Sequence, residues 1–473
     1  MISYNKLGFK AGLEIHQQLE THKLFCSCPS LTNKKEKPDF IIKRKLRASA
    51  GEEGKVDVAA LYEMQKSKEF IYEVYADCDC LVDIDCEPPH DINEDALDTA
   101  LMVAKMLNAD IVDEIQVMRK VVVDGSNVSG FQRTMLVAVD GYIETTRGKV
   151  GIPVICLEEE AAKKIMETKD NVTYRLDRLG VPLLEIATDS SIKNAKHAKE
   201  VAGLIGMVLR STSRVKRGLG TIRQDVNVSI SKGDRVEIKG FQDLKSITKV
   251  IDNEINRQLS LIKQKKKIKK EVRRVEEDFS TSFLRPMPSA ARMYPETDIK
   301  PIIITEARLK MIETPTLISE RAEGFEKKYK LNAAIAREII KENIPFDYYA
   351  EKYKVNSKLI ADVLIEMPKE IKARYNLDVK AKKEDFEKIF LSLENKMINR
   401  ESAFDILVDV AKGKKVDANK YKKMNASELE DEIKVIVEEN KGASLNAIMG
   451  EVMKRYRGKI DGAKVMEIIK KLL

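Results

Sequence analysis

The pattern of apolar residues changes near residue 300, and this change limits the fold more than any other feature of the chain. Before it, apolar residues alternate in short runs typical of β-strands, with a few helical stretches between them. After it, almost every stretch repeats with the period of an α-helix. A chain of 473 residues also exceeds what one hydrophobic core usually supports. The sequence therefore predicts an α+β protein with two or three domains.

The composition is typical of a soluble, highly charged protein, with 43% hydrophobic and 34% charged residues. No apolar run reaches the roughly 18 residues of a membrane-spanning helix, and the N-terminus lacks the apolar core of a signal peptide. We therefore expect a cytoplasmic protein with no membrane contact. The net charge of +8 permits nucleic-acid binding without requiring it.

The segment Phe9–Glu20 alternates like a half-buried strand and places Glu14 and His16 on the same face. A carboxylate and an imidazole side by side form half of a metal or acid–base site. A solvated strand face is the alternative, and one strand alone favours it. Only four histidines occur in the chain, so few are available for such a role.

Two further acidic elements favour a site. Glu159 lies in the run Leu157–Glu160, where Glu158 and Glu160 are alternatives, and Glu185 interrupts an apolar, strand-like stretch. A carboxylate buried there costs several kcal/mol unless a cation or hydrogen-bond donors meet it. Carboxylate oxygens are the ligands that Mg²⁺ prefers. We therefore expect one divalent ion to be held by four side chains, namely Glu14, His16, Glu159 and Glu185.

Residues 222–239 predict a β-hairpin around a turn at 231–234. Its apolar residues share one face, and polar residues fill the other on both strands. Such a polar face suits a concave, solvent-filled site, although an ordinary exposed sheet face has the same pattern. The chain contains no GxxxxGK[ST] and no GxGxxG motif, so a nucleotide would have to be held by a metal and side chains.

Two C-x-C pairs could supply four thiolates to one tetrahedral zinc ion. The expected ligands are Cys26, Cys28, Cys78 and Cys80. Whether Cys80 or Cys86 completes the set stays open, and reduced, buried thiols without metal are the alternative. Such an ion would stabilise the fold and would not catalyse a reaction.

Seven long motifs occur in order along the chain. They are GLEIHQQLETHKLFCSCP at 12–29, SGFQRT at 129–134, ICLEEEAAKKI at 155–165, DRLGVPLLEIATD at 177–189, GLGTIRQDVNVSI at 218–230, RVEIKGFQDL at 235–244 and RPMPSAARMYPETDI at 285–299. With these motifs the chain closely resembles the tRNA-dependent amidotransferase B/E family over essentially its whole length. The motif forms look like the archaeal E type rather than the bacterial B type.

The resemblance implies a carbon–nitrogen ligase of protein biosynthesis. Members of the family use ATP to phosphorylate the side-chain carboxylate of Glu mischarged on tRNA(Gln), and ammonia then displaces the phosphate to give Gln-tRNA(Gln). The motif match carries the Mg²⁺ roles onto Glu14, His16, Glu159 and Glu185. From the alternation of the hairpin we expect five of its polar residues to position ATP or the aminoacyl end: Arg223, Asp225, Asn227, Glu237 and Lys239.

The resemblance also implies partners. Ammonia would come from a separate glutaminase subunit of the archaeal D type in a heterotetramer, since nothing in this sequence resembles an amidase. One alternative is a B-type subunit that works with an amidase partner on Glu-tRNA(Gln) or Asp-tRNA(Asn). Another is a tRNA-binding scaffold without catalytic activity, which the full acidic set argues against.

The fold that the resemblance implies is an antiparallel sheet domain shaped as a cradle at 1–300, a helical domain at 301–400 and a YqeY-like tail at 401–473 that binds tRNA. In the tail, a basic cluster of Lys454, Arg455 and Arg457 could contact RNA, although cations at the end of a helix also satisfy its dipole. E-type members usually carry an inserted domain before residue 285. Residues 271–283 bridge that gap directly, which leaves open how tRNA(Gln) is selected.

Overall fold

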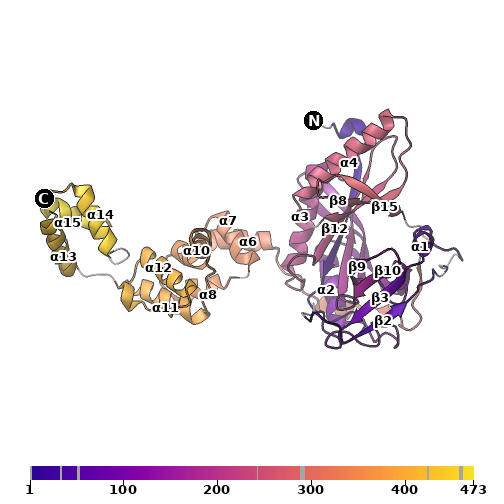
Figure 1. Cartoon of the computed structure of the whole chain (residues 1–473), viewed down its shortest axis with the longest axis horizontal. Coiled ribbons are helices and arrows are strands. Elements are labelled where there is room, and N and C mark those ends of the chain that lie inside the picture. The colour runs from indigo at the N-terminus through magenta and orange to yellow at the C-terminus, as the bar shows by residue number, and fades with distance from the viewer. Residues whose placement is uncertain are drawn as a thin grey trace. The chain divides into compact units, whose positions relative to one another are not determined.

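The computed structural model describes residues 3–31, 35–48, 50, 54–241, 243–287, 293–342, 344–422, 426–440, 442–456 and 462–472. The chain forms two compact units, Met1–Leu317 and Ile318–Leu473 (Figure 1). Within the described residues, the strands all lie in the first unit and the second is helical, so the predicted α+β class is confirmed. No helix in the described part of the chain combines the length and apolar character needed to cross a membrane.

An eleven-stranded sheet forms the centre of the first unit. In sheet order its strands are β15 (Thr281–Pro286), β14 (Glu271–Val275), β13 (Val236–Phe241), β12 (Ile222–Ser229), β1 (Lys10–Gln18), β11 (Pro182–Ala187), β8 (Gly148–Glu159), β7 (Phe131–Thr145), β6 (Val117–Val121) and β16 (Met293–Pro295), with β4 (Asp110–Ile111) paired to β7. All pairs are antiparallel except β13 with β14. The predicted antiparallel sheet has this one parallel exception, because the chain crosses over through α4 between the two strands.

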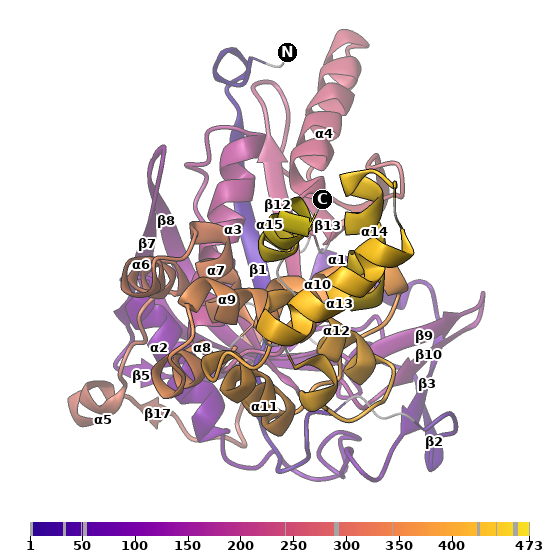
Figure 2. The same ribbon diagram turned by 90° about the vertical axis from the view of Figure 1, so that its left-hand side faces the viewer.

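Three helices cover one face of this sheet. They are α2 (Glu94–Met106), α3 (Ala195–Ser211) and α4 (Ser246–Lys263), and their apolar residues share one core with Leu13 and Ile15 of β1. Helices α3 and α4 contact each other, and α4 also contacts β12 (Figure 2). Asn93 and Asn194 cap α2 and α3 by accepting hydrogen bonds from backbone N–H groups of the first turn. The opposite face of the sheet is left for polar residues.

A smaller sheet completes the first unit. Its order is β2 (Phe40–Arg44), β3 (Glu69–Val74), β10 (Asn171–Arg175) and β9 (Lys163–Glu167), and its own core includes Phe70, Tyr72 and Tyr174. Strands β3 and β10 are parallel, which is a second departure from an antiparallel domain. The remaining described elements of this unit are a 3-10 helix (Asn5–Leu7), β5 (Glu114–Ile115), β17 (Ile302–Ile303), α1 (Val58–Met64) and α5 (Glu306–Met311).

The second unit consists of helices, as the sequence predicts. They are α6 (Ile318–Tyr329), α7 (Ala333–Lys341), α8 (Phe346–Lys352), α9 (Ser357–Ala361), α10 (Met367–Tyr375), α11 (Lys383–Glu394), α12 (Arg400–Ala411), α13 (Ala426–Glu439), α14 (Leu445–Tyr456) and α15 (Gly462–Leu472). One apolar core joins residues between 322 and 410, and a second joins residues between 429 and 469. The division into domains at 300 and 400 stays a prediction.

Candidate functional site

The polar face of the main sheet brings three of the four predicted ligands, Glu14, His16 and Glu185, together on neighbouring strands. His16 of β1 is paired with Glu185 of β11, and Glu185 is paired in turn with Cys156 of β8. Because side chains alternate along each strand, Glu14 and His16 share a face with Glu185, and Leu13 and Ile15 enter the core. The alternation read from the sequence therefore gives the correct face of β1.

A cavity of about 230 Å³ opens on this face. Its polar lining consists of Glu14, His16, Lys120, Gln132, Glu158, Glu160, Glu185, Arg223, Glu237, Lys239 and Arg285. The cavity is lined by acidic and basic side chains from strands far apart in the sequence. Such a concentration of titratable groups around a concave space is typical of an active site.

His16 and Glu185 form the centre of the acidic group. Nε2 of His16 lies 3.6 Å from Oε2 of Glu185. Burial acts to lower the pKa of His16, but contact with Glu185 outweighs it and the pKa is raised. Burial acts to raise the pKa of Glu185, yet Lys120 and His16 hold this pKa well below its ordinary value. The pair is thus stabilised as an imidazolium next to a carboxylate when no metal is present.

Glu158 is a second acidic group of the cavity and is fully buried. Its Oε1 atom accepts hydrogen bonds from Lys120 Nζ at 2.6 Å and from Thr134 Oγ1 at 3.1 Å. Burial and the neighbouring Glu185 raise the pKa of Glu158 to about 7. The same Lys120 ammonium lies 3.7 Å from Glu185, so one cation serves two carboxylates.

A three-residue cluster on β1 and β12 has the donor set of a divalent metal site. One ligand atom each from Glu14, His16 and Asp225 lies within 4.8 Å of the others. Burial and the Glu185 charge raise the pKa of Glu14, which indicates that its carboxylate has too little cationic charge around it. Two carboxylates and one imidazole fit a hard divalent cation that keeps further positions for water or phosphate.

Glu159 does not line this cavity. The structure therefore contradicts its predicted role as a metal ligand. Its carboxylate accepts a hydrogen bond from the backbone N–H of Arg133 at 3.1 Å and lies 3.3 Å from the Arg133 guanidinium. Glu158 and Glu160, the alternatives in the same run, line the cavity. The reason is the alternation along β8, which directs adjacent side chains to opposite faces.

The hairpin of β12 and β13 forms as predicted, and its polar face contributes to the cavity. Arg223 forms a 2.8 Å ion pair with Glu160, and Lys239 bridges Asp225 and Glu237. These four hairpin residues are therefore brought to the site.

Asn227 is the fifth hairpin residue, and it is not brought to the cavity. It lies further along β12, paired with Gly12, and does not line the cavity. The site thus uses only the part of the hairpin that lies opposite Glu14 and His16.

Sequence reasoning missed three polar residues of the lining, namely Lys120, Gln132 and Arg285. Lys120 lies on β6, two strands away from Glu158 in the sheet order. In the sequence it follows Arg119 inside Val117–Val121, a strand-like segment that contains no acidic residue. Its partner could not be read from the sequence because the order of β6, β7 and β8 is a property of the fold.

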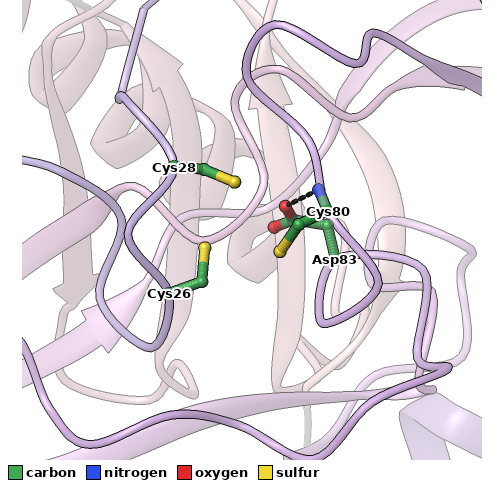
Figure 3. A group of neighbouring side chains, drawn as sticks. All are labelled: Cys26, Cys28, Cys80 and Asp83. Atoms are coloured by element: carbon green, nitrogen blue, oxygen red, sulfur yellow. Dashed lines mark hydrogen bonds between the residues drawn. The ribbon is translucent and has the colours of Figure 1, made fainter.

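The cysteine pairs meet, but with a different set of ligands than predicted. Sulfur atoms of Cys26, Cys28 and Cys80 and a carboxylate oxygen of Asp83 lie within 4.8 Å of one another (Figure 3). Cys78 and Cys86 are not members of this group, so the predicted Cys78 ligand is wrong. Asp83 replaces it because the loop after Cys80 turns back, with the Asp83 carboxylate accepting the Cys80 N–H at 2.9 Å.

The cysteine–aspartate group fits a structural zinc ion by its chemistry. Three sulfurs and one oxygen are a tetrahedral donor set of the kind that zinc accepts. Burial raises the pKa of Asp83 to about 7 even though Lys23 Nζ lies only 3.1 Å away. A bound cation would remove that penalty.

The predicted basic cluster of the tail is only partly described. Arg455 lies in the last turn of α14 and forms ion pairs with Glu451 at 3.0 Å and Glu439 at 3.1 Å. Lys454 lies beside it in the same turn. Arg457 falls outside the described residues. The ion pairs account for Arg455 structurally, so its RNA-binding role stays a prediction.

Comparison with known proteins matches most of the chain to one family. Residues 9–310 match the GatB/GatE catalytic domain, and residues 345–473 match the GatB domain. The E-type glutamyl-tRNA(Gln) amidotransferase subunit of Methanocaldococcus jannaschii is 37% identical, over 100% of this chain and 99% of the relative. Its counterpart in Archaeoglobus fulgidus is 35% identical over the same shares, and that of Methanosarcina barkeri is 36% identical over 99% and 98%.

The alignment with the Methanocaldococcus relative spans 627 positions, whereas this chain has 473 residues. The relative therefore contains segments without a counterpart here. The identity nevertheless extends across both units, and the resemblance inferred from the motifs is confirmed. This chain belongs to the GatB/GatE family.

Proposed function

We propose that this chain carries the phosphoryl-transfer and amide-forming site of a glutamyl-tRNA(Gln) amidotransferase. Its substrates are ATP, ammonia and Glu mischarged on tRNA(Gln), and its product is Gln-tRNA(Gln). The observation that carries the proposal is the convergence of Glu14, His16, Glu158 and Glu185 with Lys120 around one cavity. The names of the full-length relatives point to the same reaction.

The chemistry explains why such a site needs both acids and cations. A carboxylate does not react with ammonia because oxide is a very poor leaving group. Transfer of the γ-phosphoryl group of ATP to the Glu carboxylate releases ADP and gives an acyl phosphate. Ammonia then attacks the acyl carbon, the C–O bond to phosphate breaks, phosphate leaves with the bonding electrons, and the nitrogen loses one proton.

Glu14, His16 and Asp225 are the residues that we propose hold Mg²⁺, with Glu185 orienting His16. When bound, the ion would offset negative charge on the transferred phosphoryl group. Lys120 keeps Glu158 and Glu185 in place through its two contacts.

The basic residues of the lining supply positive charge for phosphate oxygens. Arg223, Lys239 and Arg285 reach the cavity from three strands, β12, β13 and β15. Preorganised cations of this kind stabilise charge that develops on a transferred phosphoryl group. We propose that they position ATP, since the sequence has no glycine-rich phosphate-binding motif.

The ammonia and the tRNA require partners. We propose a glutaminase subunit of the archaeal D type in a heterotetramer, a cytoplasmic location, and tRNA contacts by the C-terminal helices around Lys454. Co-purification distinguishes the alternatives, since an asparaginase-like partner supports the E type and an amidase partner supports the B type. We further propose that Cys26, Cys28, Cys80 and Asp83 hold a structural zinc ion.

An amidation assay tests the proposal. Glu-tRNA(Gln), ATP and ammonium chloride are supplied to the purified chain, and Gln-tRNA(Gln) and ADP are measured. We expect product only when ATP is present, and we expect His16→Ala to lose at least about 100-fold in rate. Glu144→Gln, an exposed acid outside the cavity, is the matched control and should keep full activity. Full activity of His16→Ala would refute the assignment of the site.

A further inference from the structure

One end of the main sheet carries a group of lysines that the proposed chemistry does not use. Six of them lie in the eight residues at the end of helix α4 and just beyond it, in a run without any acidic residue. The members are Lys263, Lys265, Lys266, Lys267, Lys269 and Lys270, and all six are exposed. Among the described residues, none of the six forms an ion pair. We call this run, residues 263–270, the lysine run.

The lysine run is fixed to the body of the first unit. Ile268, in its middle, is 4% exposed and belongs to the main core. The backbone N–H groups of Lys265 and Lys266 donate to carbonyl oxygens of Ile262 and Leu261 at the end of α4. The lysines on both sides of Ile268 therefore extend from an anchored loop.

Two other segments bring further lysines to the same end of the sheet. The N–H of Ser231, in the turn between β12 and β13, donates to the carbonyl oxygen of Leu7 at 2.8 Å. A Cβ atom added to Gly233 in this turn would lie 3.0 Å from Ile268, so the turn packs directly against the lysine run. These segments contribute three more exposed lysines that form no ion pair within the described part of the chain: Lys6, Lys10 and Lys232.

One lysine of this basic end, Lys10, lies on the face that carries the cavity. Lys10 and Glu14 lie four residues apart on β1, so alternation places them on the same face, about 14 Å apart along the strand. The spacing is smaller than the diameter of an RNA helix. A molecule that reaches Glu14 with one end can thus lie across the lysines with the next part of its length.

We infer that the lysine run and the neighbouring Lys6, Lys10 and Lys232 bind the phosphate backbone of the substrate tRNA, an inference that rests on the proposed function. The chemistry of the patch favours RNA over a protein partner. No large apolar side chain is exposed among the described residues of these three segments, whereas protein interfaces depend on apolar and aromatic anchors and are depleted in lysine. Lysines without a carboxylate partner are the groups that neutralise phosphates and release counterions.

Binding of an uncharged tRNA transcript to the full chain, measured at several salt concentrations, tests the inference without requiring turnover. The variant is Lys265→Gln/Lys266→Gln/Lys267→Gln, which keeps Ile268. The matched control is Lys37→Gln/Lys163→Gln/Lys169→Gln, which removes the same charge from exposed positions around the small sheet. We expect the variant to bind about tenfold more weakly at low salt and to reduce the slope of log affinity against log salt by about 2 to 3.

The control should leave both quantities unchanged, and unfolding curves show that each variant is folded. Equal slopes for wild type and variant, or an equal loss in the control, would overturn the inference. Loss of binding to a glutaminase subunit with unchanged RNA binding would also overturn it, and would assign the patch to a protein. The transcript carries no Glu, so this binding measurement does not depend on amidation. The inference can therefore fail while the proposed function holds, and the reverse is also possible.

Discussion

The two faces of strand β8 carry charged groups in different surroundings: one face borders an open cavity, and the other carries buried ion pairs. On one face, Glu158 lines a cavity of about 230 Å³ that the side chains do not fill, together with Glu160 directly after the strand. On the other, Glu159 meets Arg133, and Arg133 Nε also donates to Glu296 at 2.8 Å. Arg119 completes this second group by donating to Glu296 at 2.5 Å.

The difference between Glu158 and the paired carboxylates of the other face lies in how completely each charge is compensated. Burial acts to raise the pKa of Glu296, but its two arginine partners hold that pKa below the ordinary value. Burial raises the pKa of Glu158 to about 7, in spite of Lys120. A fully paired buried carboxylate is costly to remove because its partner is left without a counter-charge, whereas a carboxylate short of cations can receive a metal or a substrate. Adjacent residues of one strand thus serve different purposes.

The largest expected effect is a difference in amidation rate between variants on the two faces. Glu158→Gln keeps the shape of the side chain but removes its charge from the cavity, and we expect a loss of about 10²- to 10³-fold in amidation rate. Glu159→Gln, at the next position, should keep its rate per folded molecule. Rate measurements at saturating ATP and tRNA decide between them, and equal losses would remove the distinction between the faces.

The second expected effect is a loss in the free energy of unfolding when an ion pair of the buried face is broken. Glu159→Gln leaves Arg133 buried without a full counter-charge, and we expect a loss of about 3 kcal/mol in the free energy of unfolding. The double variant Arg133→Met/Glu159→Gln should be less destabilised than the sum of its single changes. Denaturant unfolding measures all of them. Additive losses would show that the two residues do not act as a pair.

The group of Cys26, Cys28, Cys80 and Asp83 is a third set of buried titratable side chains that can be compared with the two faces of β8. Here we expect stability to depend on a bound ion, so a strong chelator should lower the melting temperature by several degrees. Cys80→Ser should remove zinc from the purified protein, as measured by metal analysis. Cys78→Ser is the matched control, because this buried thiol lies outside the cluster. Retention of zinc by Cys80→Ser would contradict the ligand set.

The smallest effect is a pH dependence of stability on the open face. The pKa of Glu158 is raised from 4.5 to about 7, so the native state keeps a proton that the unfolded chain loses between these values. Stability from this group is therefore lost as the pH rises from about 5 to 7, by roughly 2 kcal/mol. Unfolding curves of wild type and Glu158→Gln in a chelator, across this range, should diverge with pH. Parallel curves would show that Glu158 is charged in the folded protein.

Local sequence patterns predicted the elements and much of the site. The alternation around Glu14 and His16 identified β1 and its polar face, and the alternation of residues 222–239 identified the hairpin of β12 and β13. The same alternation could have excluded Glu159. Since Ile155 and Leu157 enter the core, Glu158 and Glu160 must lie on the other face. Here the signal was present in the sequence.

Other features could not be read from local patterns. The pairing of Lys120 with Glu158 depends on β6 and β8 both flanking β7. The choice of Asp83 over Cys78 depends on a loop that turns back on Cys80, whereas the symmetry of two C-x-C pairs favoured four thiolates. In each case the decisive contact joins segments whose approach is set by the whole fold.

Trapping of the acyl phosphate tests the central claim most directly. Wild type, Glu158→Gln and Glu159→Gln are incubated with Glu-tRNA(Gln) and ATP without ammonia. Hydroxylamine is added, and only the γ-hydroxamate formed from the activated side chain is measured, because the tRNA ester itself gives the α-hydroxamate. We expect hydroxamate from wild type and from folded Glu159→Gln, and almost none from Glu158→Gln. The same yield from all three proteins, or hydroxamate lost only in Glu159→Gln, would contradict the assignment of the chemistry to the open face of β8.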